Sequence, residues 1–473
     1  MFDKDKINNA IAILKQRFGD QLSTSEAVRS HHCHTTTRIP QQWPDAVVFA
    51  SSTEEVAETV RICHENDCPV IAFGIGSSLE GHVNAPHGGV CIDMNGLNKV
   101  IEVNNEDLDV VIQPGVTREA LNEYLRDTGL FFPIDPGANA SLGGMAATRA
   151  SGTNAVRYGT MKDNILALEA VLPDGRIVRT GSRAKKSSAG YDLTRLLVGS
   201  EGTLGIITEI TLKLYGIPEV IAGGTCSFPS VESACNAVIN VIQYGIPVAR
   251  IELLDVVQVR ACNQYSGLDL PETPLLLLEF HGSEASVAEQ AELFASISED
   301  YTDYKFQWTS DEAARKKLWK ARHDAYYASL AYVPGAVGVS TDVCVPISRL
   351  AECVEETYRD IEENGLISPI VGHVGDGNFH CMPMSDPEDQ EMREKIDGFI
   401  KRLSERAIAM GGTCTGEHGV GQGKQDYLRK EHGDAVDVMM MIKSTIDPKG
   451  IMNPGKIFPQ NQAGAARANT RPE

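Results

Sequence analysis

Two short glycine-rich segments carry the residues with the clearest chemical potential. GHVGDGNFH contains His373 and His380, and GEHGVG contains Glu417 and His418. Two neutral imidazoles and a carboxylate can ligate a divalent metal and leave positions open for a substrate, and the fourth residue could act as a base beside it. His-x6-His around Gly-Asp-Gly is not a helix pattern, so the first segment must fold back on itself. The alternative is that these are hydrogen-bonded loop histidines and that the glycines only serve tight turns.

Three more regions rich in small residues lie between positions 74 and 205. The first follows a predicted buried strand and can present amides and hydroxyls to a phosphate, although a plain turn explains it equally well. In the other two, missing side chains let the backbone approach something flat or charged. None matches G-x-G-x-x-G at a strand-to-helix turn, so an extended flavin dinucleotide fits better than a nicotinamide one. The regions comprise Gly74, Gly76, Ser77 and Ser78; Pro136, Gly137, Ser141, Gly143, Gly144, Ser151, Gly152, Tyr158 and Gly159; and Gly199, Glu201, Gly202 and Gly205.

The elements that must position these residues can be read from the intervening sequence. DAVVFAS, PVIAFG and GVCIDM are predicted strands, TREALNEYLRDTG a helix, and ILALEAVLPDGRIVRTG a hairpin that turns at Asp174-Gly175. After Pro218, strands such as LLLLEFHG alternate with helices such as SVESACNAVINVIQYG. We predict an N-terminal helical segment (1–43), a cofactor domain (44–217), a substrate domain with the metal site (218–425), a C-terminal helical segment (426–459) and a disordered tail (460–473).

Composition excludes several classes of function. The net charge is -21 and no Lys/Arg-rich run is present, which argues against nucleic acid as a partner. An acidic surface would repel an anionic bilayer, although a local patch could still dock to one, and no stretch approaches the ~18 apolar residues of a membrane span. Neither a secretory nor a mitochondrial signal is evident. The eleven cysteines are odd in number and scattered, so we expect reduced thiols and a cytoplasmic location. Peripheral contact with the inner membrane face is the alternative.

The cluster His31, His32, Cys33 and His34 also offers ligand atoms. Adjacent residues cannot easily converge on one ion. We therefore interpret these side chains as solvated or as support for other residues.

Several long segments resemble one family. They are PDAVVFASSTEEV, GIGSSLEGH, PIDPGANASLGGMAATRASGTNAVRYGTMKDN, LLVGSEGTLGIITEITLKL, STDVCVPIS, GHVGDGNFH, GEHGVG and IDPKGIMNPGKIF. Together they resemble the FAD-linked oxidases of the vanillyl-alcohol oxidase / para-cresol methylhydroxylase superfamily, over residues 44–458. Within it the chain resembles the FAD-dependent D-lactate dehydrogenases, close to the glycolate oxidase subunit and D-2-hydroxyglutarate dehydrogenase branches.

The resemblance implies an α+β fold with a two-subdomain FAD-binding domain, a cap domain with an antiparallel sheet, and a C-terminal helical segment that returns to the flavin. It implies that His373, His380 and Glu417 ligate a divalent metal, for which two histidines and a glutamate suit Zn²⁺ or Mn²⁺, and that His418 is the catalytic base. Arg322 would bind the substrate carboxylate, although its position alone is equally consistent with a surface salt bridge. The FAD contacts would be Gly74, Ile75, Gly76, Ser77, Ser78, Pro136, Gly137, Ser141, Gly143, Gly144, Ala147, Ser151, Gly152, Tyr158, Gly159, Glu201, Gly202, Gly205, Ile206, Ile207 and Asn453.

Two departures from the 2-hydroxyglutarate branch bear on the substrate. That branch has Lys-Tyr-Asp where this chain has Ser340-Thr341-Asp342, and Asn where this chain has Met382. Losing a cation and an amide leaves little to bind a second carboxylate. We therefore expect oxidation of a small D-2-hydroxy acid, D-lactate to pyruvate, by hydride transfer to FAD. The residues around His82 do not resemble a histidyl attachment site, so non-covalent FAD is expected.

Other functions stay open at this point. The chain could be a glycolate or D-2-hydroxyglutarate dehydrogenase, or a redox-neutral FAD enzyme of the same fold. A non-catalytic flavin subunit and a flavin-free metal hydrolase are further alternatives. No cytochrome or iron–sulfur motif is present, so electrons must leave to oxygen or to a separate acceptor such as a cytochrome, a quinone, an electron-transfer flavoprotein or a dye. We also expect a homo-oligomer, although nothing in the sequence sets its size.

Overall fold

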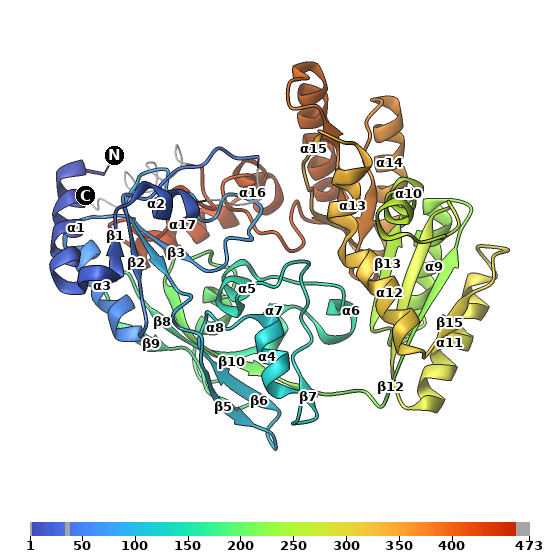
Figure 1. Ribbon diagram of the computed structural model, residues 1–473, viewed down its shortest axis with the longest axis horizontal. Coiled ribbons are helices and arrows are strands. Elements are labelled where there is room, and N and C mark those ends of the chain that lie inside the picture. The colour runs from blue at the N-terminus through green and yellow to red at the C-terminus, as the bar shows by residue number, and fades with distance from the viewer. Residues whose placement is uncertain (1, 34–37, 460–473) are drawn as a thin grey trace. The chain divides into compact units, whose positions relative to one another are not determined.

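The computed structural model describes residues 2–33 and 38–459, and Figure 1 traces the chain. His34 and the tail predicted at 460–473 lie outside the described residues. Of the described residues, 2–33, 38–151, 160–216 and 417–459 form one compact unit, called the first unit, and 152–159 and 217–416 form the second unit. Within the described ranges, no helix combines the length and the apolarity needed to cross a membrane.

The units depart from the predicted domain ranges at two short segments. Residues 152–159 group with the second unit, where the Tyr158 hydroxyl bonds Nδ1 of His281 at 2.7 Å. Residues 417–425 group with the first unit, where the Glu201 carboxylate accepts from the amides of Val420 and Gly421 at 2.7 and 2.9 Å. Bonds between residues so far apart in sequence leave no local signal, so sequence patterning could not place these boundaries.

The first unit contains a four-stranded sheet in the order β1-β2-β4-β3, in which β2 and β3 run parallel to β4. Helices α1 and α3 share its hydrophobic core, and α1 buries Ile7, Leu14 and Phe18 on one side. The Ser52 hydroxyl caps α3 by accepting from the Glu55 amide at 3.2 Å. The bounds are α1 Lys4–Phe18, β1 Leu22–Ser23, α2 Glu26–His31, β2 Ala46–Phe49, α3 Thr53–Glu65, β3 Val70–Phe73 and β4 Val90–Asp93.

A five-stranded antiparallel sheet forms the second subdomain of the same unit, in the order β5-β6-β10-β8-β9. Residues of α4 and α5 complete its core. The predicted hairpin is β8-β9, with Gly175 in its turn at φ +85°. The bounds are β5 Val100–Asn104, β6 Asp109–Ile112, α4 Arg118–Leu125, β7 Leu130–Phe131, α5 Leu142–Thr148, α7 Met161–Asn164, β8 Ile165–Val171, β9 Ile177–Arg179, α8 Leu193–Leu197, β10 Ile206–Lys213 and β11 Tyr215–Gly216.

The predicted C-terminal helical segment is present as α16 (Gln425–His432) and α17 (Ala435–Ile446). Ile442 and Ile446 of α17 pack against the core of the five-stranded sheet. Beyond α17 the chain runs beside β3, where the Asn453 amide donates to the Val70 carbonyl at 2.8 Å. The Asn453 side chain also donates to the His82 carbonyl at 3.2 Å, so it contacts the segment that follows β3.

The second unit is built on a seven-stranded antiparallel sheet in the order β15-β12-β14-β13-β18-β19-β17, as predicted for the cap domain. Its strands are β12 Val220–Ser227, β13 Arg250–Leu254, β14 Leu275–Gly282, β15 Gln307–Thr309, β17 Val343–Cys344, β18 Ile370–Gly372 and β19 Asn378–Cys381, and a separate pair comprises β16 Val337–Gly338 and β20 Met384–Ser385. Its helices are α6 Ala155–Tyr158, α9 Val231–Gln243, α10 Val256–Ser266, α11 Glu284–Ser298, α12 Glu312–His323, α13 Ala325–Tyr332, α14 Leu350–Glu363 and α15 Gln390–Ala409.

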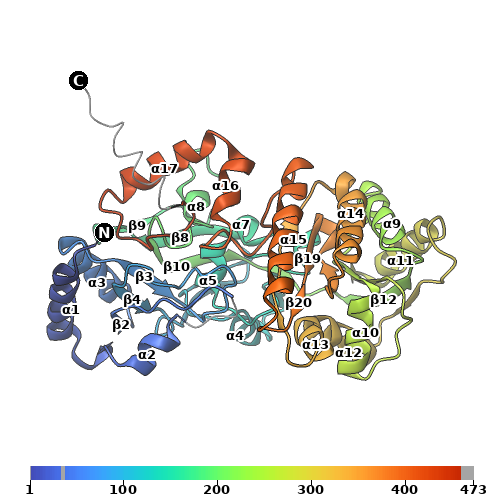
Figure 2. The ribbon, with the colours of Figure 1, turned by 90° about the horizontal axis from the view of Figure 1, so that it is seen from above.

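Helices cover both faces of this sheet (Figure 2). Residues of α9, α11, α14 and α15 form the larger core with one face, and residues of α10, α12 and α13 pack on the other. Side chains alternate along each strand, so Ile251 and Leu253 of β13 enter the larger core. Arg250 and Glu252 therefore point to the opposite face.

Asp255, at the start of α10, makes the stability of the fold dependent on pH. It is 1% exposed, and its carboxylate accepts from the Gln258 amide at 2.8 Å. Burial raises its pKa to about 7, although backbone amides oppose the shift. Between the ordinary carboxyl value of about 4 and about 7, the folded state keeps a proton that the unfolded chain has lost. Its contribution to stability is therefore present below about pH 4 and is lost as pH rises through about 7.

Asp255→Asn keeps a capping oxygen and removes this titration. We expect the melting temperature to change little near pH 4 and to rise by several degrees at pH 8. Thermal unfolding followed by circular dichroism at both values checks this. An asparagine variant less stable than the parent at pH 8 would contradict it.

Candidate active site

The segment with the two predicted histidine ligands forms a tight reversal between β18 and β19. His380 on β19 lies opposite Val371 of β18. Gly377 closes the turn at φ +80°, where a Cβ would collide with the Val345 carbonyl. As predicted, the segment folds back on itself. It brings the rings of His373 and His380 to a centroid distance of 5.4 Å, edge to face.

Hydrogen bonds fix how each ring presents its nitrogens. Nδ1 of His373 lies 2.7 Å from Oε1 of Glu252, and Nδ1 of His380 lies 2.9 Å from the Thr341 carbonyl. Both partners can only accept, so each Nδ1 carries a proton, which leaves Nε2 as the metal-binding atom of the neutral ring. This is the tautomer that a histidine adopts when Nε2 binds a metal.

The second predicted segment is anchored by the residues before it. The Thr415 hydroxyl donates to Oδ2 of Asp342 at 2.8 Å. Gly416 packs so closely on Asn378 that a Cβ would collide with its amide. Glu417 and His418 follow directly, so this packing restricts where they can lie.

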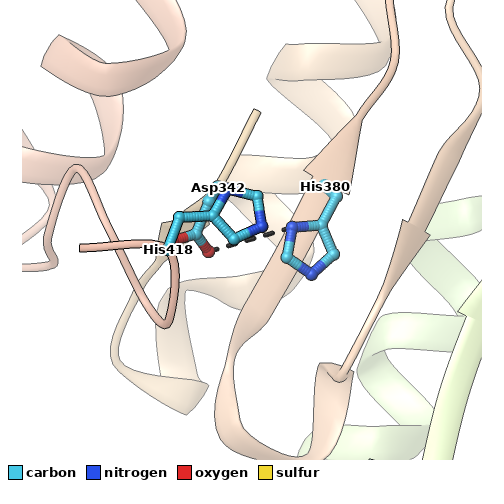
Figure 3. A group of neighbouring side chains, drawn as sticks. All are labelled: Asp342, His380 and His418. Carbon is cyan, nitrogen blue, oxygen red and sulfur yellow. Dashed lines mark ion pairs between the residues drawn. The ribbon is translucent and has the colours of Figure 1, made fainter. Parts of the chain in front are cut away.

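Two overlapping groups of donor atoms result. One atom each of His373, His380 and Glu417 lie within 4.8 Å of one another, and the same holds for Asp342, His380 and His418. Figure 3 shows the His418 ring beside the carboxylate of Asp342. Because Asp342 already accepts from Asn378 and Thr415 at 2.7 and 2.8 Å, the first group is the better donor set. Two imidazoles and one carboxylate fit Zn²⁺ or Mn²⁺.

Arg322 is not in a surface salt bridge. Its side chain is 11% exposed, and Nε and Nη2 lie 2.8 and 2.5 Å from Oε2 of Glu252. Glu252 itself is fully buried on β13. Burial would raise the pKa of this carboxyl, but Arg322 and His373 lower it below its usual value. The predicted metal ligand and the predicted carboxylate binder therefore share one buried anion.

In the first unit, the three small-residue regions converge. A Cβ on Gly74 would collide with the Ser141 hydroxyl. The loop after β3 therefore packs directly against the start of α5. Among the described residues, the buried Ser78 hydroxyl has no hydrogen-bond partner. Gly76 has φ +76°. A loop with an unsatisfied hydroxyl and little side-chain bulk fits the phosphates of a dinucleotide.

The third region joins the other end of α5. The amides of Gly199 and Glu201 donate to the carbonyls of Ala146 and Ala147 at 2.9 Å each. Asn453 donates from its side chain to the Glu201 carbonyl at 2.7 Å. Burial would raise the pKa of the Glu201 carboxyl, but His82 and the amides of residues 420 and 421 lower it. That carboxylate therefore holds the segment that follows His418, a role that the sequence did not suggest.

Some predicted cofactor residues have a packing reason that needs no ligand. Gly143 leaves room for Pro114, and a Cβ on Gly205 would lie 2.9 Å from the Val171 carbonyl. Ile206 and Ile207 are buried in hydrophobic cores. The remaining predicted residues fall into two groups. In the first unit, Ser151 is buried, Gly202 is half-buried at φ +72°, and the exposed or half-buried residues are Ile75, Ser77, Pro136, Gly137, Gly144 and Ala147. The second unit contains Gly152, Tyr158 and Gly159.

Sequence reasoning missed two acids of the site. Glu252 is the one acid within the strand RIELL, and an acid flanked by the buried aliphatic residues Ile251 and Leu253 was an available signal. Asp342 was noted only as part of a departure from a related branch. Its contact with Asn378 depends on the pairing of β17 with β19, which the sequence does not reveal.

Comparisons with known proteins cover nearly the whole chain. A model of an FAD binding domain matches residues 44–181, and a model of the C-terminal domain of FAD linked oxidases matches residues 217–457. A Danio rerio protein named probable D-lactate dehydrogenase, mitochondrial, is 50% identical over 461 residues, covering 96% of this chain and 93% of that one. An Arabidopsis thaliana protein named D-lactate dehydrogenase (cytochrome), mitochondrial, is 46% identical over 456 residues, covering 95% and 80%.

Solved structures confirm the predicted fold class. The structure of p-cresol methylhydroxylase with substrate bound matches with a TM-score of 0.79, covering 97% of this chain and 98% of that one. At 17% sequence identity, this likeness shows the fold alone.

Proposed function

The chain belongs to the FAD-linked oxidases, and we propose that within this family it oxidises D-lactate to pyruvate with the help of a divalent metal and a histidine base. Both domains of an FAD-dependent oxidoreductase are matched. The observation that carries the proposal is the grouping of His373, His380 and Glu417, with His418 adjacent in sequence. The two relatives described above are both named D-lactate dehydrogenases, which supports the choice of substrate.

The residues of the chain divide the work of the reaction. When bound, FAD supplies the two-electron acceptor and the metal supplies a Lewis acid that lowers the pKa of the substrate hydroxyl. Arg322 binds the substrate carboxylate and fixes its orientation. His418 takes the hydroxyl proton, while the Cα hydrogen leaves with both electrons of its bond. Loss of one proton and one hydride converts the 2-hydroxy acid to the 2-oxo acid. A carboxylate oxygen of Asp342 and a ring nitrogen of His418 lie within 4.8 Å of each other, so a negative charge stands close to the proposed base.

The lining near His380 favours a short side chain on the substrate. Met382 is 6% exposed and packs against Gly338, where a Cβ would lie 3.1 Å from its Cγ. The Thr341 hydroxyl donates a hydrogen bond to the Cys381 carbonyl at 3.1 Å. Neither residue offers a cation to a second carboxylate, which favours D-lactate over D-2-hydroxyglutarate. Glycolate lacks the methyl group that an apolar side chain such as Met382 would contact.

A separate carrier accepts the electrons in this proposal. One relative carries the word cytochrome in its name, which supports a cytochrome as the acceptor. The expected cytoplasmic location, peripheral membrane contact, homo-oligomer and non-covalent FAD stay predictions.

Anaerobic mixing of the yellow protein with substrates tests the proposal. D-lactate is expected to bleach the flavin absorbance, while L-lactate leaves it unchanged because its Cα hydrogen points the wrong way. Faster bleaching by glycolate or D-2-hydroxyglutarate would transfer the assignment to that acid. Absence of bleaching by every 2-hydroxy acid would favour a redox-neutral enzyme.

A further inference from the structure

One fully buried carboxylate divides its two oxygens between two site residues. Oε1 of Glu252 accepts a hydrogen bond from Nδ1–H of His373 at 2.7 Å. Oε2 accepts a hydrogen bond from Nε of Arg322 at 2.8 Å and forms an ion pair with its Nη2 at 2.5 Å. The register of β13 against β18 pairs Leu253 with Gly372, which places Glu252 next to the start of the histidine turn.

We propose that Glu252 is a positioning residue that sets the metal ligand His373 and the carboxylate binder Arg322 together, so that metal affinity and substrate affinity depend on the same side chain. The proposal rests on the function proposed above. It assigns to Glu252 no contact with the substrate or with the metal.

The chemistry of each partner explains why both need the anion. A histidine ligand whose Nδ1–H is held by a carboxylate keeps its ring orientation and becomes a stronger donor at Nε2, and loss of such a partner weakens metal binding by about 10- to 100-fold. The guanidinium of Arg322 is planar, so binding through Nε and Nη2 turns Nη1 away from Glu252. A buried arginine without its carboxylate would be free to turn.

The same sheet face contains a matched control. Glu279 of β14 is 2% exposed and accepts from Nε2 of His281 at 2.8 Å, with Nη1 of Arg315 at 3.5 Å. Its cross-strand neighbour is Arg250, two residues from Glu252. Glu279 thus resembles Glu252 in burial and in its histidine and arginine partners, but it does not bind His373 or Arg322.

The test compares Glu252→Gln, Glu279→Gln and Arg322→Lys in the full-length, FAD-containing protein. After metal removal, binding of Mn²⁺ is followed through the electron paramagnetic resonance signal of the free ion, and the KM for D-lactate is measured separately with a dye acceptor. Glu252→Gln is expected to weaken Mn²⁺ binding by about 10- to 100-fold and to raise KM in parallel. Glu279→Gln is expected to change neither quantity, and Arg322→Lys to raise KM alone.

The outcomes separate this proposal from the function on which it rests. A parent protein that binds no Mn²⁺ and does not react with D-lactate overturns the function. A parent that does both, with Glu252→Gln binding Mn²⁺ as tightly and showing the same KM, overturns the role of Glu252 alone. Equal losses in Glu252→Gln and Glu279→Gln would show a general effect of removing a buried charge and would also overturn it. If Glu252→Gln does not fold, Glu252→Asp, which keeps the charge and shortens its reach, is compared in the same way.

Discussion

Replacing His418 with asparagine is expected to lower the rate of flavin reduction by D-lactate by about 10²- to 10⁴-fold, with FAD and metal still bound. Asparagine is close to histidine in size and polarity but cannot accept a proton at neutral pH. The residues that group as metal donors, His373, His380 and Glu417, remain in place. Anaerobic stopped-flow measurement of the flavin absorbance gives the rate, and FAD and metal contents are determined on the same sample.

His432→Asn is the matched control for this variant. His432 lies on α16 with its side chain 39% exposed, and its Nε2 contacts Glu431 at 3.4 Å. Its replacement should leave the rate of flavin reduction unchanged. Normal bleaching in His418→Asn would remove His418 from the role of base, whereas loss of FAD from the variant would point to a structural role.

Removing the divalent metal with a chelator is expected to abolish turnover, and adding Zn²⁺ or Mn²⁺ is expected to restore it. Without the ion, the hydroxyl of a 2-hydroxy acid keeps a pKa far above that of a histidine, so proton transfer becomes strongly unfavourable. Metal analysis before and after chelation, together with the initial rate, checks this. The metal that restores the highest rate identifies the better occupant of the site.

Glu417→Gln tests the role of the metal by a change in the protein instead of by a chelator. It replaces the anionic ligand with a neutral amide, so metal content should fall while FAD content stays the same. Full turnover in a sample shown to contain no metal would exclude the ion from the mechanism. Turnover that fails to return after metal addition, with FAD still bound, would indicate that chelation had damaged the protein.

Much of the fold could be predicted because its elements have strong local signals. The apolar side of α1, the strands Ala46–Phe49 and Val70–Phe73, and the hairpin at Asp174-Gly175 all follow from periodicity and turn chemistry. The histidine turn was also recognisable, because glycines at 375 and 377 exclude a regular helix between His373 and His380.

What could not be predicted depends on contacts between distant residues. The Glu252 carboxylate meets His373 only because β13 pairs with β18, and 121 positions separate the two residues. The family resemblance assigns Glu201 to the cofactor, whereas its carboxylate accepts hydrogen bonds from amides 219 and 220 positions away. Neither contact produces a periodic pattern in the sequence.

The alternation along β13 has a consequence for how this protein can change. Ile251 and Leu253 support the larger core, while Arg250 and Glu252 carry charge on the other face. Substitutions of Ile251 or Leu253 would alter how well the chain folds, whereas substitution of Glu252 would alter what the proposed site can bind. Within these five consecutive residues, positions that support folding alternate with positions that carry charge. A substitution of one kind therefore need not affect the other.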